Sequence, residues 1–290
     1  MLVAAAALCC APGAVAQENL GPNPPPAGIP TPQPPGQPEP RYIQPTWTIE
    51  AEPAMWYVAP GGFIQLPGGI TVSSELLLQD LNLDNPRPSP FMELHVREEF
   101  WRLTVSGVEF QTHGRGSVQQ STGTVGGQSF APGTPVSSSL DFASFQVEAG
   151  YRLKVSGLLA GENVPDYFAM WEAVGGVRFI NADFNLDLPT GHASGHEFMG
   201  APYVGVKMTQ EIVHGFTIDA EVNVGMFGAG DRSLYTNDIC VGFMWRPWDN
   251  VGVQMGYRQI AFTMKSGRDA DKFLWDGAMA GLYWGVVIRF

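Results

Sequence analysis

Residues 281–290, "GLYWGVVIRF", alternate between two kinds of side chain. Every second residue is large and apolar: Leu282, Trp284, Val286, Ile288 and Phe290. The residues between them are two glycines, a tyrosine, a valine and an arginine. Successive side chains of a β-strand point to opposite faces of the sheet, so this period of two predicts a strand with one apolar face.

The same alternation recurs along the chain from Trp47 onward. Ten segments fit it: 47–59, 90–98, 100–112, 138–155, 167–184, 198–212, 216–229, 234–247, 250–264 and 276–290. Most are longer than the five or six residues usual in soluble sheets, and they reach the roughly 9–11 residues that cross a bilayer as a strand. The start of the first segment and residues 60–89 leave eight and twelve strands as alternatives to ten.

The connections between these segments alternate between short and long. Short turns fall at Glu98–Glu99, at Gly215 and at residues 247–250, and residues 157–166 form a connection of moderate length. Between them lie 60–89, 113–137, 185–197, 230–233 and 265–275, most of which are longer and richer in Gly, Ser and Asp. This rhythm is typical of an all-β, closed antiparallel transmembrane barrel with short periplasmic turns and long extracellular loops. We therefore expect the apolar face of each strand to contact lipid and the polar face to line the lumen.

Aromatic residues gather on the short-turn side of this arrangement. They are Trp47, Phe100, Trp101, Trp245, Trp248 and Phe290. Amphipathic rings favour the level of the lipid headgroups, so we expect these residues to form the periplasmic girdle of the barrel.

Composition and the N-terminal region agree with export to the outer membrane of a Gram-negative-type bacterium. Charged residues are only 15% of the chain, and the net charge of −12 argues against nucleic acid as a partner. Residues 1–16 predict a cleaved signal peptide, and residues 17–46, with eleven prolines, predict a disordered periplasmic tether. The barrel is then residues 47–290, and Cys240 is its one cysteine, which we expect to be a small inward-facing filler.

The last strand resembles the C-terminal signal of bacterial outer-membrane β-barrel proteins. The matching residues are Tyr283, Gly285, Ile288 and Phe290. The resemblance implies that the barrel-assembly machinery is a partner, that outer-membrane lipid surrounds the chain, and that the last strand closes against the first. The region from Ser233, with "WRPWDNVGVQMGYR", is similar to a group of small outer-membrane barrels of uncharacterised function, which implies a fold and a location but no activity.

Alternation assigns a nearly balanced set of charges to the lumen. The acidic members are Glu50, Glu52, Glu93, Glu109, Glu148, Glu172, Glu211, Asp219, Glu221 and Asp238; the basic members are Arg97, Arg102, Arg152, Lys154, Arg178, Lys207, Arg246, Arg258 and Arg289. Unpaired charges in a confined space are costly, so these side chains are expected to pair and to close the lumen. A structural or surface-interaction role follows, with a surface partner bound through the extracellular loops; a narrow channel for small solutes is the alternative.

One cluster carries residues of the kind used in catalysis. His192 and Ser194 resemble the His-x-Ser pair of outer-membrane lipid A deacylases, with Glu197 nearby as an acid. His192, His196 and Glu197 are also a candidate metal set. We favour a solvated polar loop at this place, and we expect no enzyme activity, no cofactor and no metal. His95 is expected to face the lumen as a structural hydrogen-bonding residue.

Overall fold

The computed structural model describes residues 47–68, 76–118, 123–153, 169–213 and 215–290. The predicted signal peptide and tether, and the lumen candidate Lys154, lie outside these residues. Ten long strands are present: β1 (Thr48–Gln65), β3 (Arg87–Arg97), β4 (Trp101–Ser117), β7 (Pro135–Leu153), β8 (Ala169–Leu188), β9 (Gly191–Val213), β10 (Phe216–Ala229), β11 (Arg232–Trp248), β12 (Val251–Ser266) and β13 (Phe273–Arg289). Three short strands accompany them: β2 (Leu76–Leu77), β5 (Gly123–Val125) and β6 (Gln128–Phe130).

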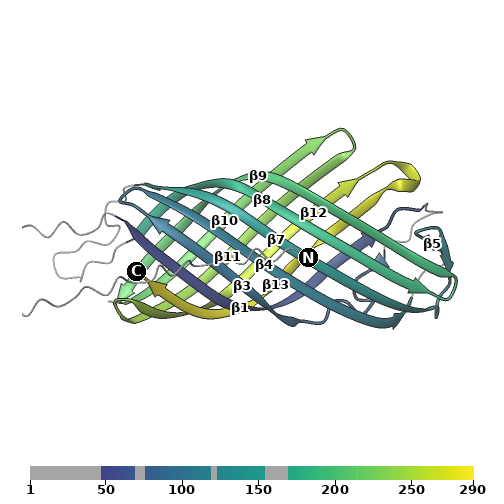
Figure 1. The fold of residues 1–290 in the computed structure, drawn as a ribbon, viewed down its shortest axis with the longest axis horizontal. Coiled ribbons are helices and arrows are strands. Elements are labelled where there is room, and N and C mark those ends of the chain that lie inside the picture. Colours follow the sequence, from purple (N-terminus) through teal and green to yellow (C-terminus); the bar gives the residue numbers. More distant parts are fainter. Residues whose placement is uncertain (1–46, 69–75, 119–122, 154–168, 214) are drawn as a thin grey trace, which may run out of the picture. The chain divides into compact units, whose positions relative to one another are not determined.

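The ten long strands form one closed antiparallel ring. Each pairs with the next along the chain, and β1 also pairs with β13 over registers from Glu50–Arg289 to Gln65–Leu274. Figure 1 shows the strands running obliquely and side by side, with hairpin turns at both ends. The predicted ten-stranded barrel is confirmed, and its apolar outer band, described below, is that of a transmembrane barrel.

The described residues contain one helical turn, η1 (Asp269–Asp271). No helix among them is long and apolar enough to cross a membrane.

The two ends of the barrel differ in their connections. At one end, here called the short-turn end, lie the tight reversals before β4 and before β12 together with Trp47 and Phe290. The backbone N–H of Phe290 donates to the carbonyl of Ile49 at 2.9 Å, so the last residue is fixed to the first strand. The opposite end, here called the far end, carries the β8–β9, β10–β11 and β12–β13 turns and the segments around β2, β5 and β6.

At the far end the strands continue well past their predicted limits. The prediction of a loop over 185–197 was wrong, because β8 runs to Leu188 and β9 begins at Gly191, leaving only Pro189 and Thr190 between them. With 19, 20 and 23 residues, β7, β8 and β9 are about twice as long as the roughly 9–11 residues that a bilayer requires. The Gly, Ser and Asp residues of 185–197 are typical of a loop, but all except Pro189 and Thr190 in this stretch belong to regular β-strands.

The half of the barrel next to the short-turn end carries an apolar outer surface. The predicted girdle residues Trp47, Phe100, Trp101, Trp245, Trp248 and Phe290 are all exposed at its rim. Above them, exposed aliphatic and aromatic side chains extend around the ring, among them Leu103, Val147, Val204, Met255 and Leu282. A continuous apolar band of this extent is not stable in water and marks contact with a membrane.

In the far half the two faces of several long strands exchange character, clearly so on β4, β7, β8 and β12. On β12, Met255 points outward and is 61% exposed, whereas Ile260, Phe262 and Met264 point inward and are 2% exposed or less. The expectation that the apolar face is outward along the whole strand was therefore wrong for this half. The alternation of the backbone is unbroken; it is the apolar residues that move from odd to even positions after Arg258.

The inward apolar residues of the far half form a core, here called the apolar core. It contains Trp56, Val58, Ile64, Phe110, Leu140, Phe142, Ile180, Phe184, Phe262, Met264, Phe273, Trp275 and Met279. Trp275 lies among three other rings, with centroids 4.5 Å from Phe262, 4.9 Å from Phe184 and 5.8 Å from Phe142, all edge to face. Each such pair contributes about 0.5–1.5 kcal/mol beyond the burial of its surface.

The described part of the segment between β1 and β3 packs into the same core. Leu76, Leu78, Leu81 and Leu83 are at most 2% exposed and belong to the same apolar cluster. The Ser138 hydroxyl donates to the carbonyl of Leu81 at 2.8 Å, which ties this segment to β7. We refer to these four residues as the leucine cap.

Candidate functional site

The inward residues of the half next to the short-turn end surround a cavity of about 230 Å³, here called the inner cavity. Its walls carry charges of both signs, including Glu93, Lys207 and Asp219. Arg246 and Arg289, whose side chains are 22% and 36% exposed, line its edge and give it contact with solvent at the short-turn end.

The predicted lumen charges within the described residues lie on inward faces, with one exception. Glu109 points outward and Phe110 takes the inward position beside it. Glu109 lies beyond the place where β4 changes the character of its faces, so a polar residue there belongs to the outside. Its assignment to the lumen was wrong.

Arg102 joins two acidic residues on neighbouring strands. Its guanidinium donates to Glu172 at 2.7 Å, to Glu148 at 2.9 Å and to the Thr104 hydroxyl at 2.6 Å. The Tyr203 hydroxyl donates to the other oxygen of Glu148 at 3.0 Å. The side chains of Arg102, Glu148 and Glu172 are at most 2% exposed, so these charges depend on one another for compensation.

A second arginine network lies deeper, where the charged half meets the apolar core. Arg258 donates to Asp238 at 2.8 Å and to Glu93 at 3.1 Å, and its guanidinium lies 4.9 Å from the ring centroid of Phe91. Arg178 also pairs with Asp238 and donates to Gln146. The side chains therefore extend across the lumen and pair between strands far apart in the ring.

At the seam of the barrel, Glu50 pairs with two arginines. Arg289 of β13 donates to Glu50 of β1 at 2.6 Å, and Arg246 of β11 donates to the same oxygen at 3.3 Å. These side-chain contacts link β13 to β1 inside the ring, in addition to the backbone pairing of the same two strands.

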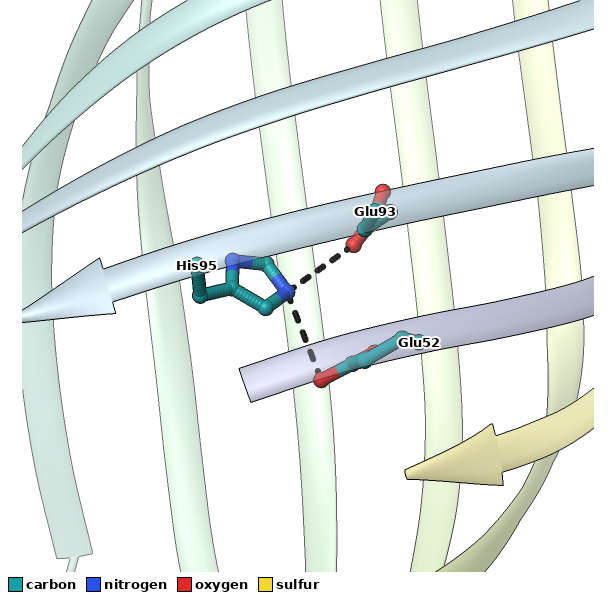
Figure 2. Close-up of side chains that lie close together, drawn as sticks. All are labelled: Glu52, Glu93 and His95. Carbon is teal, nitrogen blue, oxygen red and sulfur yellow. Dashed lines mark ion pairs between the residues drawn. The ribbon is translucent and has the colours of Figure 1, made fainter. Parts of the chain in front are cut away.

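Glu52, Glu93 and His95 form a compact cluster on the wall of the inner cavity (Figure 2). The Nε2 atom of His95 lies 3.3 Å from an oxygen of Glu52 and 3.4 Å from an oxygen of Glu93. Its Nδ1 atom hydrogen-bonds the Thr104 hydroxyl at 2.8 Å. In the part of the chain that the structure describes, these three residues are the group whose side chains could together hold a metal ion.

Sequence reasoning placed His95 on the inward face, where the structure has it, but did not combine it with Glu52 and Glu93. The sequence contains the elements of this cluster: Glu93 and His95 two residues apart on one predicted strand, and Glu52 on the strand before it. Finding it required the register between β1 and β3, in which Glu52 is the direct partner of Glu93.

The candidate catalytic residues do not come together. His192 and Ser194 are exposed on the outer face of β9, whereas Glu197 is buried on the inner face and accepts from Arg232 and Ser266. Residues an odd number apart on a strand lie on opposite faces, so His192 and Glu197 cannot act on one substrate or hold one ion. His192 instead lies 2.8 Å from Asp187.

Three residues of the predicted insertion signal, Tyr283, Gly285 and Ile288, lie on β13, the strand that closes the ring, and Phe290 directly follows it. Tyr283 points inward and packs over Gly242 and Gly256, where an added Cβ would lie within 2.2 Å and 2.7 Å of its atoms. Cys240 also faces inward, with its sulfur 3.6 Å from the Tyr283 hydroxyl. Phe290 is exposed at the rim.

No protein-family model matches the sequence, and no curated protein does. Solved structures match with low similarity. Neisserial surface protein A is 13% identical with a TM-score of 0.31, covering 84% of this chain and 97% of its own. The transport unit of the autotransporter AIDA-I from Escherichia coli is 10% identical with a TM-score of 0.37, covering 88% and 94%. The Pseudomonas putida toluene transporter TodX is 9% identical with a TM-score of 0.27, covering 86% and 90%.

Proposed function

We propose that this chain is an outer-membrane β-barrel that does not conduct solutes and that displays a rigid barrel extension at the cell surface. The short-turn end faces the periplasm and the far end faces outward. The apolar outer band with its aromatic rim supports insertion in a membrane. In this proposal the last strand, with Tyr283, Gly285, Ile288 and Phe290, is the segment that the assembly machinery binds.

The observation that carries the proposal is the apolar core inside the far half. Barrels that conduct solutes have polar, water-filled interiors. Here a solute would have to pass the paired charges around Arg102 and Arg258 and then a core in which Trp275 and Phe184 are fully buried. Packed protein interiors leave few gaps larger than a water molecule.

The outer surface of the far half supports a role outside the membrane. Many outward residues of β4, β7, β8 and β9 there are polar, among them His113, Asp141, Asp183, Asp187 and Ser194. Such residues are stable in water but not in lipid tails, so β7, β8 and β9 extend beyond the membrane as regular strands. A surface partner would then meet a stiff sheet as well as loops.

Conductance distinguishes this proposal from the narrow channel. The purified barrel, added to a planar lipid bilayer, is expected to give no stable unit steps, while a general diffusion porin added under the same conditions gives them. Reproducible steps from the wild-type protein would refute a closed lumen.

Surface labelling tests the orientation. Asp187→Cys at the far end and Asp249→Cys at the short-turn end are made in a Cys240→Ser background. On intact cells, a membrane-impermeant maleimide is expected to label the first variant and not the second; after lysis both react. The opposite pattern on intact cells would reverse the proposed orientation.

The lipid-acting hydrolase has no support from the placement of its candidate residues. Ser194→Ala is expected to leave the lipid A of cells that overproduce the protein unchanged relative to cells that overproduce the wild type. A difference in acylation between the two would restore that hypothesis.

A further inference from the structure

Three ligand-type side chains converge at one point of the inner cavity (Figure 2). Glu52 of β1 and Glu93 of β3 are direct cross-strand partners, and His95 lies two residues beyond Glu93 on the same face. One atom from each lies within 4.8 Å of the other two. Like charges placed directly opposite each other on a sheet are destabilising, so a cation between the two carboxylates would stabilise this position in addition to Arg258, which donates to Glu93 at 3.1 Å.

The distances within the cluster indicate what that charge is. The Nε2 atom of His95 is 3.3 Å from Glu52 and 3.4 Å from Glu93. A charge-assisted N–H···O bond is about 2.7–2.9 Å long, and a single N–H points at one acceptor. In a tetrahedral zinc site with metal–ligand bonds of about 2.0–2.2 Å, two ligand atoms lie about 3.4 Å apart. The two distances from His95 Nε2 therefore match the spacing of ligands around an ion better than that of direct hydrogen bonds, and all three ligand atoms lie within 4.8 Å of one another.

The hydrogen bonds that other residues make to His95 and Glu93 are also those expected of metal ligands. His95 uses its other ring nitrogen, Nδ1, to hydrogen-bond Thr104 at 2.8 Å. Arg258 donates at 3.1 Å to Glu93 Oε1, the oxygen that is not directed at His95. Metal-binding imidazoles and carboxylates are commonly oriented by hydrogen bonds of this kind.

Burial and space are also suitable for an ion. The side chains of His95, Glu52 and Glu93 are 4%, 9% and 19% exposed, so they are held in place yet border the inner cavity. The cavity has room for water as a fourth ligand and is connected to solvent at the short-turn end through Arg246 and Arg289.

We propose that Glu52, Glu93 and His95 bind one divalent transition-metal ion of the Zn²⁺ class, with water completing the coordination. A 2+ ion neutralises both carboxylates with a neutral imidazole, while Arg258 remains paired with Asp238. The ion would join β1 to β3 next to the seam where β1 meets β13. This inference does not depend on whether the lumen is closed.

Zinc titration tests the proposal. The folded barrel is purified in detergent without a histidine tag, treated with EDTA, dialysed and titrated with Zn²⁺ by calorimetry. The wild type is expected to bind one ion per chain, and His95→Asn and Glu52→Gln are expected to lose saturable binding. Thr104→Val should keep the stoichiometry with about 10–100-fold weaker affinity. The control variant His192→Asn/His196→Asn should bind as the wild type does, because its exposed histidines lie on the outer face.

Two results would overturn the site: no saturable Zn²⁺ binding by the wild type, or equal binding by His95→Asn. Either would leave the cluster as an ion-paired group only. Heat-modifiable migration in gels checks that each variant is folded. If His95→Asn does not fold, the isosteric Glu93→Gln takes its place, and the visible absorption of bound Co²⁺ reports whether a tetrahedral nitrogen–oxygen site is still present.

Discussion

Replacing Trp275 by alanine removes the centre of the apolar core. The indole is fully buried and lies edge to face with Phe142, Phe184 and Phe262 at 4.5–5.8 Å. Truncating a buried aromatic side chain to alanine costs about 3–5 kcal/mol, because the transfer free energy is forfeited and a cavity remains. Since the three edge-to-face ring pairs are removed with the indole, the free energy of unfolding should fall by about 4 kcal/mol.

The matched control is Trp284→Ala on the same strand, where the side chain is exposed and faces outward. Lipid tails fill the space that this substitution leaves, so no lasting cavity forms and the loss should stay below about 2 kcal/mol. Both variants are refolded into phospholipid vesicles and unfolded in urea, with the folded fraction read from heat-modifiable gel migration and extrapolated linearly to water. If Trp275→Ala cost no more than Trp284→Ala, the far half would have no packed core and the closed lumen would lose its basis.

Two further predictions test the exchange of faces and the buried charges. On β12, Met255→Arg places a charge on the outer apolar band and should lower the free energy of unfolding by about 2–4 kcal/mol. Thr263→Arg, on the outward face in the far half, should change it by less than about 0.5 kcal/mol. Equal losses in the same urea assay would contradict the boundary between the two halves. Arg102→Met should cost about 3–5 kcal/mol, because Glu148 loses its arginine and Glu172 keeps only Arg97 at 3.8 Å. Adding Glu148→Gln and Glu172→Gln should recover most of that loss, and a triple variant as unstable as the single one would show that the arginine acts through packing rather than charge.

The ring of strands was predictable because the alternation of apolar and polar residues can be read within each segment, without knowing which other strand it pairs with. Residues 218–226, for example, alternate without a break, and all ten predicted segments form strands. Alternation alone does not say which face is inward, however. The positions of the apolar residues along the strand carry that information. On β7, the inward Leu140 and Phe142 have even numbers, whereas the outward Phe145 and Val147 have odd numbers. The change from even to odd marks where the surroundings of the barrel change from water to lipid.

The sequence predicted most of the charged residues that face the interior, but not which of them form ion pairs with one another. Alternation placed Arg102, Glu148 and Glu172 on inward faces, where they are. Which residues touch depends on register and on how far each strand is shifted along its neighbour, and neither follows from one sequence. The cluster of Glu52, Glu93 and His95 depended on that information, as did the separation of His192 from Glu197.

The height of the outer apolar band sets a preferred bilayer thickness. Above the band, polar side chains such as His113, Asp141 and Asp183 begin on the same outward faces. Longer acyl chains would cover these residues, and each ångström of mismatch costs a fraction of a kcal/mol. The protein should therefore insert fastest into vesicles of short-chain lipids, and in thicker ones it should compress the bilayer around itself rather than sink into it.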